Sequence, residues 1–67
     1  MKRIDLIRDL ERAGCEFVRH GSRHDVYRNA ATGRQTAVPR HREVADSLCR
    51  LIRRQLGLDP SDAAGPQ

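Results

Sequence analysis

The sequence predicts one small α+β domain in which a helix is followed by three antiparallel strands and a second helix. Apolar residues recur at helical spacing near both ends of the chain, whereas the segment between them alternates as strands do. Only short loops containing glycine separate the predicted strands. With 67 residues, the chain has room for a single domain.

The first helix is predicted over residues 3–13. Ile4, Ile7 and Leu10 recur at three-residue steps, and charged residues fall mainly on the opposite side of the helix. Gly14 follows the last periodic position, where helices often end in a left-handed residue that glycine adopts at little cost. We therefore expect an amphipathic helix that ends at Gly14.

Three strands are predicted over residues 15–19, 24–28 and 34–38. The first strand alternates with a period of two, and Pro39 closes the third because proline cannot donate to a sheet ladder. Parallel neighbours need a long crossover, so loops this short force antiparallel pairing. The sequence therefore predicts a three-stranded antiparallel sheet.

A second helical pattern follows Pro39 and ends at Gly57. Its apolar residues at helical spacing are Val44, Leu48, Leu51, Ile52 and Leu56. Arg50, Arg53 and Arg54 are expected to face outward. Two amphipathic helices and a one-faced sheet bury their apolar sides best as two layers, with both helices packed on one face. This layout is similar to that of double-stranded-RNA-binding domains, but layout alone does not establish RNA binding.

The domain is expected to comprise residues 1–58. Residues 59–67 are small, polar and turn-rich, so we expect a disordered C-terminal tail. No apolar run approaches the length of a membrane span, and the first residues lack the apolar stretch of a secretory signal. Cys15 and Cys49 form no Cys-x-x-Cys pair, which is typical of buried thiols in a reducing compartment. We expect a cytoplasmic protein.

The charge of the chain favours a polyanionic partner. Thirteen Lys and Arg residues stand against nine Asp and Glu, for a net charge of +4, and twelve of the thirteen are arginine. The planar guanidinium matches phosphate oxygens and stacks on bases, which suits nucleic acid. A genome rich in GC gives the same bias without any functional cause, so composition leaves both explanations open. So small a chain has little volume for a deep pocket, and chemistry is expected on an exposed surface.

His24 is the candidate for catalysis. It follows the Gly21-Ser22 turn and opens a strand, where solvent and substrate can reach its ring. Histidine passes protons near neutral pH, and RNA carries its own nucleophile in the 2′-hydroxyl, so cleavage needs no metal. A solvated strand residue is the alternative. In a regular strand, His24 shares its face with Val26, which is expected in the core; either Tyr27 is the better-buried residue or the strand becomes regular after His24.

The other candidate site residues lie on both sides of His24 in the sequence, between residues 19 and 41. His41 can be either a second proton-transfer group or a hydrogen-bonded loop residue that fixes the entry to the second helix. Candidate RNA-binding residues are Arg19, Ser22, Arg23, Arg28, Arg40 and His41. A metal site is not expected, because no two histidines lie on one predicted helix, where i, i+4 spacing would bring them together as ligands. No cofactor is expected either.

The ordered motifs resemble those of the HicA family of bacterial toxins. They read Leu10-Glu11-Arg12-Ala13-Gly14-Cys15-Glu16-Phe17, Gly21-Ser22-Arg23-His24-Asp25-Val26-Tyr27-Arg28-Asn29, Thr36-Ala37-Val38-Pro39-Arg40-His41 and Gln55-Leu56-Gly57-Leu58. The resemblance lies in the order and spacing of these motifs, and it covers nearly all of the chain before the tail. In many members a histidine follows Gly-Ser directly. Here Arg23 intervenes, as in other members that place the histidine one residue later, before an aspartate.

This resemblance implies the toxin of a type II toxin–antitoxin pair. Such toxins have a fold similar to the double-stranded-RNA-binding domain and cleave messenger RNA independently of the ribosome. Their catalytic histidine maps onto His24. The antitoxin, HicB, is expected to cover that histidine, and the pair is expected to reach operator DNA only through the antitoxin. The alternative is a non-catalytic RNA-binding module that acts through its basic surface.

Overall fold

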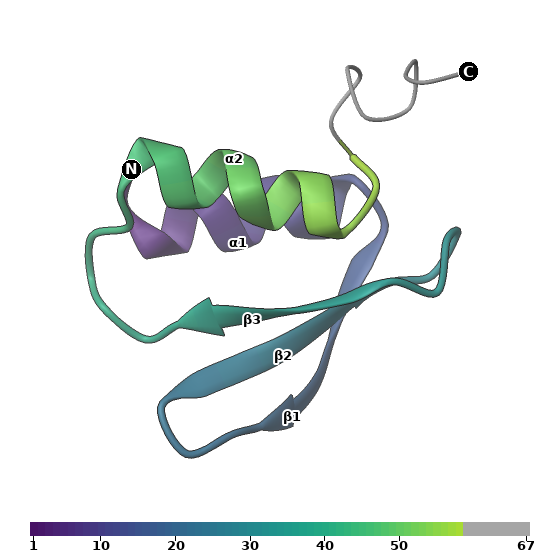
Figure 1. Ribbon diagram of the computed structural model, residues 1–67, viewed down its shortest axis with the longest axis horizontal. Coiled ribbons are helices and arrows are strands. Elements are labelled where there is room, and N and C mark those ends of the chain that lie inside the picture. The colour runs from purple at the N-terminus through teal and green to yellow at the C-terminus, as the bar shows by residue number, and fades with distance from the viewer. Residues whose placement is uncertain (59–67) are drawn as a thin grey trace.

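The computed structural model describes residues 1–58 and has the predicted order of elements. These are α1 (Arg3–Arg12), β1 (Cys15–His20), β2 (His24–Asn29), β3 (Gln35–Pro39) and α2 (Asp46–Gln55). The strands form one antiparallel sheet in the order β1-β2-β3. Both helices lie side by side over one face of the sheet (Figure 1), which confirms the predicted α+β fold. The tail predicted over residues 59–67 lies outside the described residues.

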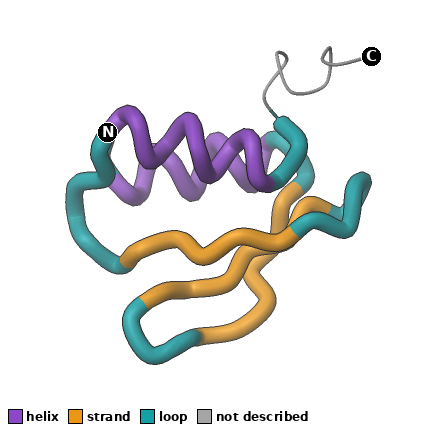
Figure 2. Tube along the Cα trace, in the orientation of Figure 1, coloured by secondary structure: helices purple, strands orange, loops and turns teal. Residues whose placement is uncertain are grey.

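The loops gather at the two ends of these layers. At one end lie the β1–β2 turn and the connection from β3 to α2, and at the other lie the remaining connections (Figure 2). Residues 21–23 and 40–45 therefore share one end of the molecule, although they are distant in sequence. Within residues 1–58, neither helix is long and apolar enough to cross a membrane.

The central strand, β2, divides its side chains between two faces. Asp25, Tyr27 and Asn29 are buried towards the helices, whereas His24 and Arg28 are exposed on the open face. Val26 is only half-buried and shares the open face with His24. The expectation that Val26 points into the core is therefore wrong, and Tyr27 is the better-buried residue. His24 belongs to the regular strand and points to its open side.

A β-bulge at Val18 changes the direction of the side chains that follow it in β1. The register shifts between Phe17, which pairs with Tyr27, and Arg19, which pairs with Val26. Paired residues share a face, and an extra residue reverses the alternation. The bulge therefore turns Arg19 to the open face and returns His20, which pairs with Asp25, to the helix side.

The core lies between the helices and the sheet. Its most deeply buried side chains are Leu6, Leu10, Val38, Ile52 and Leu56. Both cysteines are buried free thiols, and burial raises the pKa of Cys15. The apolar stripe of each helix is narrower than predicted, because Ile4 and Leu51 are exposed. Truncating a fully buried leucine to alanine leaves a cavity and costs about 2–5 kcal/mol.

The end of α2 is fixed to β2. Gly57 has a positive φ of 75°, which lets the N–H of Leu58 donate to the Arg53 carbonyl at 2.8 Å and reverse the chain. The buried Asn29 amide donates to the Leu56 carbonyl at 2.8 Å. Within residues 1–58, every buried side-chain nitrogen or oxygen has a hydrogen-bond partner. These bonds stabilise the helix end because an unpaired buried polar group is costly.

Candidate nucleic-acid interface

The β1–β2 turn places two histidines on opposite sides of the hairpin. The backbone N–H of Gly21 donates to the carbonyl of His24 at 2.6 Å, which closes the turn. A Cβ at Gly21 would lie 2.8 Å from that same oxygen, closer than real contacts allow. Only glycine fits here without a shift of the backbone, so Gly21 helps to set the relative placement of His20 and His24.

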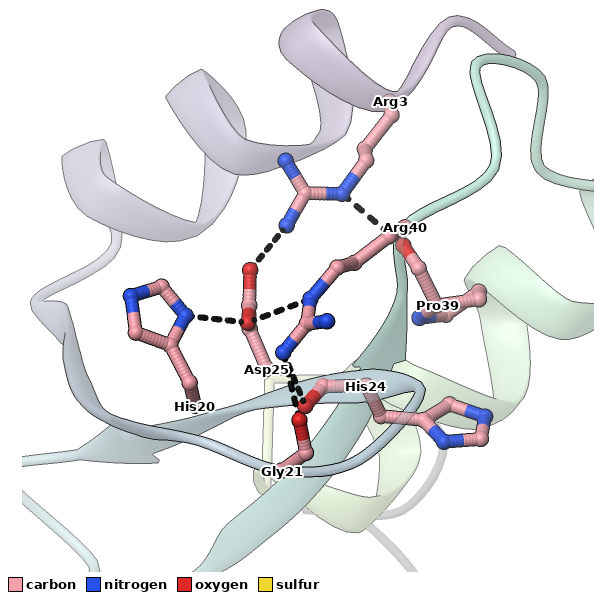
Figure 3. Close-up of polar contacts among 7 residues, drawn as sticks. All are labelled: Arg3, His20, Gly21, His24, Asp25, Pro39 and Arg40. Carbon is pink, nitrogen blue, oxygen red and sulfur yellow. Dashed lines mark hydrogen bonds and ion pairs between the residues drawn. The ribbon is translucent and has the colours of Figure 1, made fainter.

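The buried Asp25 carboxylate is the centre of a charged network beside this turn (Figure 3). It accepts hydrogen bonds from Arg3 Nη2 at 2.7 Å and from Arg40 Nε at 3.0 Å, and it lies 2.8 Å from His20 Nδ1. The hydrogen bond with His20, followed by that from Arg40, lowers the pKa of Asp25 against the opposing effect of desolvation. The carboxylate therefore remains ionised while it connects the three side chains.

Arg3 and Arg40 extend this network to the backbone. Arg3 Nε donates to the Pro39 carbonyl at 2.8 Å, which ties the start of α1 to the end of β3. Arg40 Nη2 donates to the Gly21 carbonyl at 2.5 Å and, more weakly, to that of His24 at 3.5 Å. Arg40, which the sequence suggests as an RNA contact, thus also holds the turn in place. Within residues 1–58, Arg40 donates hydrogen bonds through Nε and Nη2 but none through Nη1.

His24 lies beyond this network. Its ring points away from Asp25 and His20 (Figure 3), and its side chain is exposed. An open hollow beside the ring is lined by Arg23, His24, Arg40 and His41. Pro39 pairs with His24 across the strands, so the chain that continues from β3 brings Arg40 and His41 to the same end of β2. The residues that line the hollow are two histidines and two arginines, with no acidic residue among them.

The remaining predicted residues lie around the turn and on the open face. Ser22 and Arg23 form the exposed tip of the turn, and Arg19 and Arg28 lie on the open face with His24. Within residues 1–58, the side chains of these four residues and of the two histidines in question, His24 and His41, form no hydrogen bond or ion pair. Arg40 alone among the predicted residues is engaged by the fold.

Sequence reasoning missed Arg3, His20 and Asp25. A signal for Asp25 was present, because it shares the parity of Tyr27 and must face the core if Tyr27 does. A buried carboxylate needs cationic partners, which are abundant in this chain. Arg3 and Arg40 could not be identified as those partners, since 22 and 15 residues separate them from Asp25.

The arginines of α2 belong to the other layer of the molecule. Arg53 is half-buried and donates to Asp9 of α1 at 2.9 Å, so it is engaged within the helix layer. Because α2 covers the face of the sheet opposite to His24 (Figure 1), its arginines do not extend the surface around the hollow. Within the described part of the chain, no three His, Cys, Asp or Glu side chains are grouped so that they can hold a metal ion.

The hollow has the chemistry of a site for a phosphodiester. Imidazole accepts and donates protons near neutral pH, and guanidinium groups bind phosphate oxygens. A model of the family described as the HicA toxin of bacterial toxin–antitoxin matches residues 4–58, which include all of the strands and α2, all of α1 but its first residue, and the whole hollow. No curated protein and no solved structure matches the chain. With its motifs, its fold and nearly all of its described residues in agreement, the chain belongs to the HicA toxin family of bacterial toxin–antitoxin systems.

Proposed function

We propose that this protein is an endoribonuclease that cleaves messenger RNA independently of the ribosome, with His24 as a catalytic residue. The observation that carries the proposal is the exposed His24 ring in a hollow lined by Arg23, Arg40 and His41. The family match supports a toxin, and the arginines supply contacts for a polyanion. The cytoplasm is the compartment in which such a substrate is met.

The proposed reaction needs little from so small a protein. RNA supplies the nucleophile, its 2′-hydroxyl, so the site has to remove one proton, return another and stabilise charge at phosphorus. A histidine among arginines provides these functions without a metal. Arg19 and Arg28 on the open face, and Ser22 and Arg23 at the turn, are placed to bind the flanking phosphates. A long RNA strand can reach an exposed hollow that has no deep pocket.

The proposed partner is an antitoxin of the HicB type that covers His24. The hollow is open and basic, so an acidic surface fits it and excludes RNA at the same time. Contact with operator DNA is proposed only through the antitoxin. Covering the hollow neutralises the toxin without any change in its fold.

The test compares wild type with His24→Ala on a labelled messenger RNA. We expect both proteins to bind the RNA in a mobility-shift assay, and we expect the variant to cleave it roughly 10²–10⁴-fold more slowly, the usual contribution of general acid–base catalysis. In cells, induction of the wild type should arrest growth and degrade messenger RNA, and the variant should do neither. Equal cleavage by both proteins would contradict the role of His24. Binding without cleavage by the wild type would instead favour a non-catalytic RNA-binding module.

A further inference from the structure

We propose that His41 is the second proton-transfer group of the site, so that His24 and His41 act as a general acid–base pair on one phosphodiester. This inference rests on the proposed ribonuclease function and deepens it. Its first observation is the lining of the hollow, which contains both histidines together with Arg23 and Arg40. Two imidazoles at one phosphate allow one ring to remove a proton while the other donates one.

His41 has no visible structural task. The alternative suggested by the sequence was a hydrogen-bonded residue that fixes the entry to α2. Within residues 1–58, however, its ring forms no hydrogen bond or ion pair, and the residue is exposed. The neighbouring backbone is held instead by Arg42, whose carbonyl accepts from the Arg3 N–H at 2.8 Å, and by Val44, whose N–H donates to the Met1 carbonyl at 2.7 Å. The fold therefore leaves the ring of His41 available to a ligand.

His20 does not fit the same task. Its Nδ1 lies 2.8 Å from Asp25 Oδ1, and its ring contacts Phe17 with the ring centres 4.8 Å apart. It belongs to the helix side of the hairpin, whereas the ring of His24 points away from that side (Figure 3). Of the three histidines in the chain, only His24 and His41 line the hollow.

The Arg40 side chain, which belongs to a residue that lines the hollow, is held in place by the fold. Its guanidinium is held by Asp25 and by the Gly21 carbonyl through Nε and Nη2. Arginine has five N–H donors, so those on Nη1 remain for a phosphate oxygen. A side chain that is already ordered loses less entropy on binding than a free one, which favours a defined position for the phosphate between the two histidines.

The reaction is an internal transfer followed by departure of the 5′-oxygen. One histidine removes the proton of the 2′-hydroxyl, and the 2′-oxygen forms a bond to phosphorus. The bond from phosphorus to the 5′-oxygen breaks, and the other histidine, in its protonated form, gives that oxygen a proton. The products are one RNA with a 2′,3′-cyclic phosphate and one with a 5′-hydroxyl. A 2′-deoxy nucleotide at the cleaved position cannot react.

The experiment uses two short RNAs that differ in one atom. In the second RNA, sulfur replaces the bridging 5′-oxygen at the cleaved bond, and a thiolate leaves without being protonated. Wild type, His24→Ala and His41→Ala are compared at saturating substrate, so that binding and chemistry are separated. We expect each variant to lose roughly 10²–10⁴-fold in rate on ordinary RNA. We expect the sulfur substrate to restore the rate of one variant, whose missing residue is then the acid, and not that of the other.

Several outcomes would overturn the inference. The thermal unfolding of His41→Ala is measured beside that of the exposed variant Arg50→Ala, and equal melting curves exclude an effect of the substitution on the fold. A wild-type rate for His41→Ala on ordinary RNA contradicts the pair, and so does a loss that the sulfur substrate restores in neither variant. If the wild type cleaves neither RNA, the proposed ribonuclease function itself is wrong. Mass spectrometry of the products must show the cyclic phosphate.

Discussion

Polar side chains on the two faces of β2 differ in whether they form hydrogen bonds within the protein. Towards the helices, Asp25 is bonded to Arg3, His20 and Arg40, and Asn29 is bonded to the end of α2. On the open face, the side chains of His24 and Arg28 form no hydrogen bond or ion pair with any other described residue. Burial makes an unpaired polar group costly, whereas water satisfies an exposed one. Along this one strand, the residues that face the helices therefore stabilise the fold, and the residues between them on the open face remain available to a ligand.

The two histidines of the hairpin show the same contrast. His20 has a carboxylate partner and an aromatic neighbour, whereas His24 lines the open hollow. A carboxylate beside a histidine often marks a catalytic base, but here that carboxylate is shared with two arginines and orders the turn. The residue with more contacts is thus the structural one, and the residue with fewer is the candidate catalyst.

The largest effect on both sides of this comparison is expected from Gly21→Ala. The added Cβ would meet the His24 carbonyl at 2.8 Å, so the turn must move, and overpacking of this kind costs about 1–3 kcal/mol. Denaturant unfolding measures the loss of stability, and the cleavage rate should fall with it because the turn carries His24. Ser22→Ala in the same exposed turn is the control and should stay within about 0.5 kcal/mol of wild type. Equal stability of the two variants would show that the turn yields easily.

The helix side is tested by Asp25→Asn, which removes the charge at nearly constant volume. Because the pKa of Asp25 is lowered in the folded state, its ion pairs contribute stability that is present above the unfolded pKa and lost as pH falls through the folded pKa. The variant lacks this contribution at every pH. Its deficit in unfolding free energy should therefore be larger near neutral pH than below pH ~4, around which an unperturbed aspartate titrates. A deficit independent of pH would show that the charge of Asp25 is not what stabilises the turn.

The open face is tested by Arg19→Gln and Arg28→Gln. If both guanidiniums contact phosphates, each substitution should weaken the binding of single-stranded RNA and reduce the slope of log K against log salt by ~0.7 per lost contact. Arg50→Gln, on α2 over the opposite face of the sheet, is the matched control and should leave the slope unchanged. A fluorescence titration at several salt concentrations gives both values. Equal slopes for all three variants would exclude the open face from binding.

The smallest effect on chemistry is expected from His20→Gln. The side chain of His20 is 75% exposed and lies on the other side of the hairpin from the hollow. A surface substitution away from the reacting atoms changes free energies by within about 0.5 kcal/mol, so the cleavage rate should change less than about threefold. A loss as large as that of His24→Ala would reverse the comparison and make the pair of His20 and Asp25 the catalytic one.

The order of the elements, the antiparallel sheet and the family could all be predicted from patterns along the chain. Local periods of 3.6 and 2, glycine at the helix ends and short loops are properties of neighbouring residues, so they can be read without a structure. The sequence also identified His24 and His41 as candidates, since the turn and the end of β3 are visible in the chain. Their chemical roles remain predictions.

The directions of these side chains, and the contacts that some of them form, depend on tertiary packing and could not be predicted from local patterns. The bulge at Val18 reversed the direction of Arg19 and His20, and the burial of Tyr27 turned His24 to the open face. Arg3 and Arg40 meet at Asp25 because α1 and the end of β3 converge there, a contact that no local pattern encodes. Side-chain direction in a sheet follows register and burial, which are set by the packing of the whole domain.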